Sequence, residues 1–535
     1  MSLAMPKLGR FGTSRPRRPG RPSRHYFSWG LVLILLVFIG AAVFGGLLAG
    51  IGFTRGVALY IGLVACVLLL LLPLNMLMGL MFAGTLVAVG LVGYFTKNNM
   101  VYWAPYFLGV ILYVRLGLEK VGSNFRVPPG PTPGMVWLLL LFIVVLAAST
   151  LINEQTPIEI LLAAKNYLFM FSVLFICMYA LRSERPLEMI WRGMAWVGIL
   201  QLPVALYQYV VVGGRRVELG GQGWDAVSGT LGGSEFGGQS AGLGLVMITV
   251  ALLAMALQRA GVWSTRRAAA MVSVSIVVIA LAEVKAVVFV LLPAGLALLY
   301  WRDLRSRPSR FIAGGMATMG LVVALLASYQ VLHYGRSEET KVNITLVDRM
   351  VQGWVSETDP DAFSQSTHEM GRVAIVVHWW RENVVPGHLM HVAFGHGPSS
   401  LKFSPFNVGS VVATYPHLKI NRHTGGVLLW EVGVVGLAVY GALLFSGMVL
   451  SARLETNERI PKIHRVYLGV GMAVLGLLLI SLFYGRLHFD LAALQLISLL
   501  CLGQAGYWAV RMRRQVERPV RPAAAFVLSA APTRR

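Results

Sequence analysis

Long apolar segments alternate with short polar connections along most of this chain. A helix needs about 20 apolar residues to cross the hydrocarbon core of a bilayer. Segments of this kind lie near residues 29–50, 56–73, 75–95, 101–117, 135–152, 163–181, 190–212, 238–258, 268–282, 286–301, 311–331, 424–450, 466–484 and 490–510. The boundary at Leu72–Asn75 has no charge to fix it, and the two segments around Glu283 are short. The pattern therefore predicts an all-α, polytopic membrane helix bundle of roughly 12 to 14 spans.

One polar stretch, from His333 to Arg422, interrupts this pattern. In and just beyond it lie GRVAIVVHWWREN (Gly371–Asn383), FGHGPSS (Phe394–Ser400) and NRHTGGVLLWEVGVVGL (Asn421–Leu437). Exposed polar chain costs ordering entropy and adds no contact with the bilayer, so a membrane protein has little structural use for it. We therefore expect a large, partly helical loop that carries the chemistry.

These features divide the chain into five regions. They are a basic N-terminal segment (1–28), a transmembrane helix bundle (29–331), the large loop (332–422), C-terminal transmembrane helices (423–510) and a basic tail (511–535). Composition agrees with a membrane protein, because 56% of the 535 residues are hydrophobic and only 13% are charged. A soluble protein carries about a quarter charged residues.

The net charge of +23 is concentrated in short connections beside apolar segments. Such clusters lie in residues 7–24, 259–267, 302–310, 453–465 and 511–535. Lys and Arg in short connections mark the cytoplasmic side of a membrane protein. The distribution predicts that both termini are cytoplasmic and that the charge contacts anionic lipids, and it argues against nucleic-acid binding.

The same topology places five segments on the opposite, outer face. They are Asn153–Lys165, Gly213–Gly238, the turn at Glu283–Lys285, the large loop and Tyr484–Asp490. They hold most of the ionisable residues that the cytoplasmic charge bias does not explain. Cations on a face where few are expected indicate a functional role.

Two outer segments combine charge with special backbone. Glu283 and Lys285 interrupt the apolar run Met271–Trp301, which predicts two short spans that meet at a turn. Lys285 could pair with Glu283 or reach out of the bilayer, or it could bind an anionic lipid headgroup. Arg215 and Arg216 precede a glycine-rich sequence, Gly229–Gly233, whose amides could approach a phosphate but which also suits a plain loop.

The large loop offers the sharpest candidates. Arg372 opens a predicted short helix on which Trp379 lies on nearly the same face, so its ring could stack on a sugar beside the cation. Adjacent tryptophans at an interface are equally typical of membrane anchors. No zinc-binding spacing links the loop histidines, so no metal site is predicted.

Arg422 and His423 lie just before the next predicted span, and Glu431 follows about two helical turns into it. A histidine there can accept a proton at neutral pH, or it can simply bond to a carbonyl group. Glu431, inside an apolar helix, must pair or be protonated, and it could be a structural partner or an orienting one.

Together these residues resemble the O-antigen ligase and surface-polysaccharide polymerase family. The resemblance covers about Gly229–Leu443 and rests on Gly371-Arg372 before Trp379-Trp380, on Phe-Gly-x-Gly-Pro at Phe394–Pro398, and on an H-x4-L-x2-E-x-G pattern from His423 to Gly433. It implies a GT-C-type glycosyltransferase of the bacterial inner membrane. Such enzymes use undecaprenyl-pyrophosphate-linked glycans on the periplasmic side, without a metal or other cofactor.

Carried onto this chain, the resemblance makes His423 the family's essential loop histidine and Arg372 the arginine that begins the loop helix. Lys285 stands where an arginine is usual, and no arginine directly precedes the Gly229-Thr230 pair. Thr424 stands where ligases usually have asparagine, which favours a polymerase.

The expected mechanism is inverting transfer. Arg372, Lys285 and one of Arg215 and Arg216 neutralise the leaving pyrophosphate, and His423 activates the acceptor hydroxyl. Other expected substrate contacts are Arg422, Glu283, Trp379 and Glu431. Expected partners are the lipid-linked glycan, membrane lipids and other assembly proteins such as a flippase or a chain-length regulator.

Three alternatives remain at the level of sequence. A ligase would move finished glycan onto lipid A core, and a flippase or other transporter would place charges near mid-bilayer. A non-enzymatic export scaffold is the third. The charges that need explanation gather at the outer face, and the two halves of the chain share no repeat, so transport is the weaker reading.

Overall fold

The computed structural model describes residues 64–122, 133–218, 226–233, 239–284, 287–329, 354–364, 368–404 and 407–517. The chain forms two units, Met1–Leu71 and Leu72–Arg535. In the first unit residues 64–71 are helical. The predicted span at 29–50, the basic N-terminal segment and most of the basic tail lie outside the described residues. Everything below concerns the second unit.

The described part of the second unit is almost entirely helical, as predicted. Nine of its helical segments are long and apolar enough to cross a membrane: Leu74–Thr96, Met100–Glu119, Gly134–Ile152, Pro157–Tyr179, Arg185–Arg215, Ser240–Arg259, Thr424–Glu455, Lys462–Ser481 and Ala492–Arg513. The only strands among the described residues are two short hairpins in the large loop. The chain is therefore a multi-pass, all-α membrane protein.

The first half of the bundle contains helices of varied length, several of them continued by π- or 3-10 turns. Their bounds are α3 (Leu74–Ala83), η1 (Gly84–Ala88), α4 (Val89–Thr96), η2 (Asn99–Trp103), α5 (Ala104–Gly122), α6 (Gly134–Ile152), α7 (Pro157–Tyr167), η3 (Phe169–Phe171), α8 (Ser172–Tyr179), α9 (Arg185–Tyr207), η4 (Gln208–Val212) and α10 (Gly213–Glu218). Local sequence explains a sharp start such as that of α7. Thr156 and Glu159 form a capping box, and Pro157 occupies the first helical position.

The middle of the chain contributes η6 (Gly229–Leu231), α11 (Ser240–Arg259), α12 (Thr265–Leu281), η7 (Val287–Leu291), α13 (Leu292–Ser306) and α14 (Pro308–Tyr329). Helix α12 ends two residues before Glu283, which adopts a left-handed φ of 46°. The predicted interruption of the run Met271–Trp301 is therefore present as a turn.

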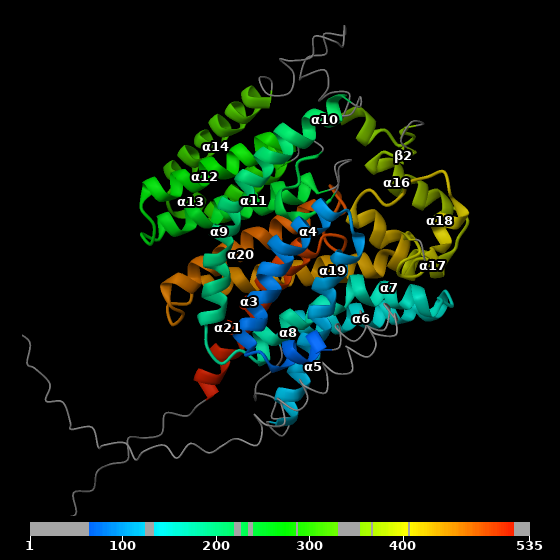
Figure 1. Ribbon diagram of the computed structural model, residues 1–535, viewed down its shortest axis with the longest axis horizontal. Helices are drawn as coiled ribbons and strands as arrows, with labels where there is room; N and C mark the ends of the chain where they lie inside the picture. Colours follow the sequence, from blue (N-terminus) through cyan, green and yellow to red (C-terminus); the bar gives the residue numbers. More distant parts are fainter. Residues whose placement is uncertain are drawn as a thin grey trace, which may run out of the picture. The chain divides into compact units, whose positions relative to one another are not determined.

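Helix α19 (Thr424–Glu455) lies at the centre of the second unit. It packs against α6 and against α20 (Lys462–Ser481), while α21 (Ala492–Glu517) packs against α8 (Figure 1). On the other side α20 contacts α11 and α13, and α11 contacts α12. The first half of α19 is buried by these neighbours and by the large loop.

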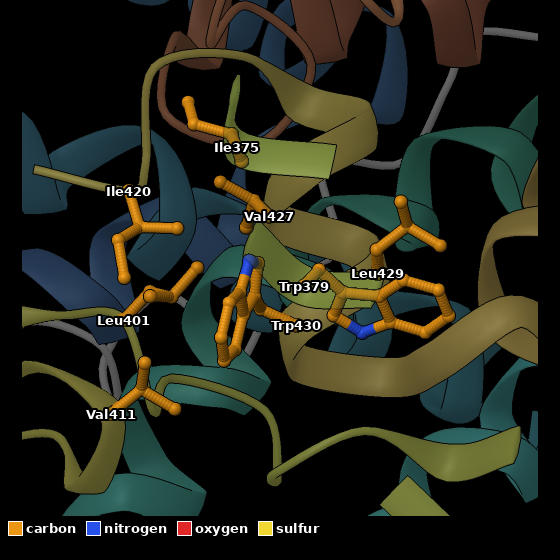
Figure 2. Packing of buried hydrophobic residues seen from close by; sticks show 8 residues of the cluster. All are labelled: Ile375, Trp379, Leu401, Val411, Ile420, Val427, Leu429 and Trp430. Carbon is orange, nitrogen blue, oxygen red and sulfur yellow. The ribbon is translucent and has the colours of Figure 1, made fainter. Parts of the chain in front are cut away.

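The described part of the large loop is a small folded layer. It contains a helical turn at residues 354–358, β1 (Phe363–Ser364), β2 (Glu369–Met370), α16 (Arg372–Trp379), η9 (Trp380–Val384), α17 (Leu389–Phe394), β3 (Phe403–Ser404), β4 (Asn407–Val408) and α18 (Ser410–Thr414). Its core consists of Ile375, Trp379, Leu401, Val411 and Ile420 together with Val427, Leu429 and Trp430 from α19 (Figure 2). Burying these apolar side chains fastens the loop to the first turns of α19.

Candidate functional site

Helix α19 is broken at Gly433, and the loop docks into the break. Gly433 has φ 69° and ψ −172°, far from helical values, so the intrahelical bonds stop there. The backbone N–H of His396 donates to the Trp430 carbonyl at 2.7 Å. The Ser149 hydroxyl lies 3.0 Å from the Glu431 carbonyl oxygen and 2.5 Å from that of Phe394. Loop and α6 thus satisfy carbonyls that the break releases.

His423 caps the first turn of α19. Its Nδ1 accepts the N–H of Gly426 at 2.9 Å, and its Nε2 lies 3.2 Å from the Arg372 carbonyl oxygen. Because Nδ1 accepts, Nε2 carries the proton and donates to that carbonyl. The ring is fully buried, which lowers the pKa of His423 to about 4 despite the bond to the carbonyl. In this arrangement both ring nitrogens form hydrogen bonds with backbone groups. Neither nitrogen is therefore available to accept a proton from a substrate.

Arg372 lies directly beside His423 and joins a network at the loop's junction with α19. Its guanidinium lies 3.1 Å from a carboxylate oxygen of Glu357, which also binds Arg422 at 2.8 Å. Its Nε donates to the Tyr484 carbonyl at 2.6 Å, and its cation lies over the Tyr484 ring, 4.8 Å from the centroid. Both arginine side chains stay partly exposed, at 26% and 34%.

Glu431 does not contact His423, so the expectation that it orients the histidine is wrong. Its carboxylate accepts a hydrogen bond from Tyr167 at 2.6 Å and lies 3.4 Å from the amide nitrogen of Leu401. It belongs to a second polar cluster with Lys402, Arg486 and Asp490, in which Asp490 pairs with both cations. Two clusters of charged side chains therefore lie on the loop side of the bundle, one around Arg372 and one around Lys402.

Trp379 is 3% exposed and packs inside the loop core, so it cannot stack on a sugar in this arrangement. The expectation that it contacts substrate is therefore corrected to a packing role. Its neighbour Trp380 is exposed. In the described parts of the chain no group of three or more His, Cys, Asp or Glu residues could hold a metal ion.

The glycine-rich sequence is a buried loop whose amides are already bonded. The N–H groups of Ser228 and Gly229 donate to the side-chain oxygen of Gln208, and that of Thr230 donates to Gln201. Two glutamines from α9 and η4 thus occupy the amides that a phosphate would need, so the loop serves helix packing.

Of the remaining predicted residues, those whose side chains the structure describes do not contact His423 or Arg372. Arg215 is exposed on α10, and the side chain of Arg216 lies outside the described residues. Glu283 is buried at the turn between α12 and η7. Lys285 lies outside the described residues, so its expected place beside Arg372 stays a prediction.

Sequence reasoning missed most of the partners in these networks. Glu357 and Tyr484 hold Arg372, while Tyr167, Lys402 and Asp490 surround Glu431. One signal did point to four of them, because Glu357 and Lys402 lie in the large loop and Tyr484 and Asp490 bound the segment Tyr484–Asp490, and both are among the five predicted outer segments.

These contacts define a multi-pass helical membrane protein with a folded loop fastened to one end of its central helix. No protein-family model matches the chain, and no curated protein matches it either.

Proposed function

We propose that this protein is a glycosyltransferase of the bacterial inner membrane that polymerises undecaprenyl-pyrophosphate-linked repeat units of a surface polysaccharide. In this proposal the large loop faces the periplasm and both termini face the cytoplasm. The observation that carries it is the pair Arg372 and Arg422, held together by Glu357 at the lip of α19.

The geometry suits a lipid-linked anion. A polyprenyl diphosphate carries its charge where the bilayer meets water, and the first turn of a spanning helix lies at that level. Guanidinium groups bind phosphate oxygens with two parallel hydrogen bonds. Arg372 donates to Tyr484 through Nε and contacts Glu357 through Nη1, and its side chain is still partly exposed, so its remaining N–H groups can contact a diphosphate that approaches from the loop side.

The proposed reaction is an inverting substitution at the anomeric carbon of the donor sugar. The acceptor hydroxyl oxygen forms a bond to that carbon, and the bond from the carbon to the diphosphate oxygen breaks. The diphosphate leaves with the electron pair and takes up the hydroxyl proton, directly or through water. Fixed cations favour this step because they stabilise the negative charge that develops on the leaving group.

His423 is a positioning residue in this scheme. Its bonds to Gly426 and to the Arg372 carbonyl fix the start of α16, and hence the arginine, against α19. This replaces the proton-acceptor role expected from the sequence.

The direct test uses purified full-length protein and a lipid-linked repeat unit. Wild-type protein should produce a ladder of longer lipid-linked glycans, with and without chelator. Arg372→Gln should slow this reaction by roughly 100-fold, the loss typical of a removed charge-stabilising donor. Arg381→Gln is the matched control, because Arg381 forms an exposed ion pair with Asp361 elsewhere in the loop. A wild-type rate in Arg372→Gln, or no elongation by wild-type protein, contradicts the proposal.

Deletion of the gene separates polymerase from ligase. Loss of a polymerase leaves single repeat units on the acceptor, whereas loss of a ligase leaves long chains on the undecaprenyl carrier. We expect single repeat units.

A further inference from the structure

We infer that a second phosphate-binding site lies under the loop, formed by Lys165, Lys402 and Arg486, and that it takes the diphosphate of a second lipid-linked substrate. The inference rests on the proposed function, because a polymerase joins two lipid-linked glycans and so handles two diphosphates. The Arg372–Arg422 pair would bind one diphosphate, and the cluster of Lys165, Lys402 and Arg486 would bind the other.

The three cations come from distant parts of the chain. Lys165 lies near the end of α7, Lys402 follows the Phe-Gly-x-Gly-Pro sequence, and Arg486 lies between α20 and α21. Lys402 and Arg486 both pair with Asp490. Lys165 lies over the ring of Tyr106, whose hydroxyl donates to the Phe489 carbonyl in the segment that carries Arg486 and Asp490. The fold thus collects positive charge from three segments at one place.

Positive charge exceeds negative charge in this cluster. Three cationic side chains face two carboxyl groups, those of Glu431 and Asp490. Within the described residues no ion pair links Lys165 to a carboxylate. Its ammonium instead lies 4.3 Å from the ring centroid of Trp103 and 4.9 Å from that of Tyr106. A partly buried excess cation is costly unless an anion joins it.

The cluster can be reached and is held rigidly. The side chains of Lys402 and Arg486 are 17% and 32% exposed, so neither is sealed. Below them, Tyr167 and Glu431 form a buried hydrogen bond. On one side the Tyr106 hydroxyl donates to the Phe489 carbonyl at 3.2 Å, which fixes the segment that carries Arg486 and Asp490. A set of partly exposed cations held by such contacts suits a phosphate group.

The segment Tyr484–Asp490 joins this site to the first. Tyr484 contacts Arg372 through its carbonyl and ring, while Arg486 and Asp490 belong to the second cluster. Two diphosphates bound on either side of this short segment would bring their attached sugars to the same face of the loop. That arrangement fits transfer from one lipid-linked glycan to another.

Binding measurements on the full-length protein in neutral phosphatidylcholine nanodiscs test this inference without turnover. The probe is geranylgeranyl diphosphate, with inorganic pyrophosphate and the prenyl monophosphate for comparison. Wild-type protein should bind two equivalents of the prenyl diphosphate. Lys402→Gln and Arg486→Gln should each weaken one of the two by roughly tenfold or more, the effect of one lost charge-assisted hydrogen bond. Arg381→Gln should bind both as the wild type does.

Asp490→Asn should change the affinity for the prenyl diphosphate in the opposite direction. It therefore distinguishes loss of a cation from misfolding of a variant. Loss of this carboxylate frees two cations, so the second equivalent should bind several-fold more tightly. A purely structural cluster predicts weaker or unchanged binding in the same variant, and either result overturns the inference. One equivalent in the wild type, or unchanged binding in both glutamine variants, also overturns it.

The source of the phosphate is decided by a second membrane composition. In phosphatidylglycerol nanodiscs, loss of the second equivalent would mean that a bilayer headgroup occupies the site, against the inference. Retention of two equivalents supports a lipid-linked substrate. Two-site binding without any glycan elongation would remove the proposed function but leave the site. Glycan elongation by the wild type together with unaltered binding in the Lys402 and Arg486 variants would remove the second site but leave the proposed function.

Discussion

The imidazole of His423 ties three segments of the chain together. One nitrogen caps the first turn of α19 through Gly426, and the other donates to the Arg372 carbonyl at the start of α16. The Phe483 ring, just beyond α20, lies 5.6 Å from the imidazole centroid. A neutral ring can make both bonds, whereas a protonated ring repels the N–H of Gly426.

Asparagine tests whether this holding role is sufficient. Asparagine is a favoured N-cap residue, so His423→Asn should keep the bond to Gly426 without a titratable group. His423→Ala loses the cap and leaves a buried carbonyl unbonded, which should lower the free energy of unfolding by about 2–4 kcal/mol. We expect His423→Asn to be destabilised far less and to keep much of the activity. Thermal unfolding in detergent and the elongation assay measure both effects. Equal inactivity of the two variants at wild-type stability would restore the role of general base.

Three histidines on the loop side, two of them buried and one partly buried, predict loss of stability in acid. Burial lowers the pKa of His396 and His423 to about 4 and that of His488 to about 3. In the unfolded chain these groups take up protons near pH 6.5. The unfolded state therefore binds more protons below that pH, so stability is complete above about 6.5 and falls as the pH drops towards 4.

Thermal melts across this range check the prediction. Wild-type protein should melt at progressively lower temperature from about pH 6.5 to 4. The slope should be smaller in His423→Asn, which has one fewer group to protonate. A wild-type melting temperature that does not change over this range rules the prediction out.

The types of residue in the sequence predicted one part of the candidate site, Arg372 and His423, but not their partners. Arg372 and His423 stood out because a cation and an imidazole at the edge of a membrane span need a reason. Their actual partners, Glu357 and Tyr484, have no such mark, since an acid in a polar loop and a tyrosine near a span are common. Only the tertiary fold shows that they meet. For the same reason the sequence predicted that Glu431 must pair or be protonated but did not name Tyr167 as its partner.

At the scale of elements, the break in α19 decides where the loop attaches. Gly433 lies against the backbone of Ala393 and Phe394, so the loop approaches the helix more closely than any side chain would permit. The apolar run 424–450 predicts one continuous span. Glycines are frequent in membrane helices, so the run alone does not reveal that this one ends a helical segment.

Substitution of Gly433 should therefore be damaging. A Cβ there would overlap the Ala393 carbonyl, and the left-handed φ adds strain. We expect Gly433→Ala to destabilise the protein by about 2–4 kcal/mol and to loosen the loop. Gly441, on the same helix, is the control, because a Cβ there would lie 3.9 Å from the Leu479 side chain, an ordinary van der Waals distance.

Limited proteolysis and thermal unfolding compare the two variants. Gly441→Ala should be neutral or slightly stabilising, as expected for alanine in a helix interior. Faster cleavage within the loop of Gly433→Ala is the expected sign of undocking. Equal behaviour of the two variants would mean that the break is not required.

At the scale of the whole second unit, charged connections between the spans contact one another. Basic connections meet each other, since Arg511 binds Glu184, Arg302 binds Glu455 and Arg259 binds Asp303. Three predicted outer segments also meet: Gln155 donates to the Pro398 carbonyl, and Lys402 pairs with Asp490. The alternation of apolar spans is what assigns each connection to one side of the membrane in the sequence prediction, because every crossing moves the chain to the other side.

Accessibility of introduced cysteines tests the orientation. In a Cys66→Ser background, Val385→Cys in the loop should react with a membrane-impermeant maleimide on intact spheroplasts. Arg459→Cys, in the connection between α19 and α20, should react only after permeabilisation. Both positions are exposed in the fold. The opposite pattern would reverse the orientation, and labelling of both from one side would contradict the sorting itself.

Part of the attachment of the loop to the bundle uses main-chain atoms of the loop. Carbonyls of Phe394, Gly395 and Pro398 receive bonds from side chains of α6 and the residues that follow it. Anchors of this kind do not depend on which side chains the loop displays elsewhere. Substitutions on the outward surface of the loop can therefore accumulate without weakening these anchors.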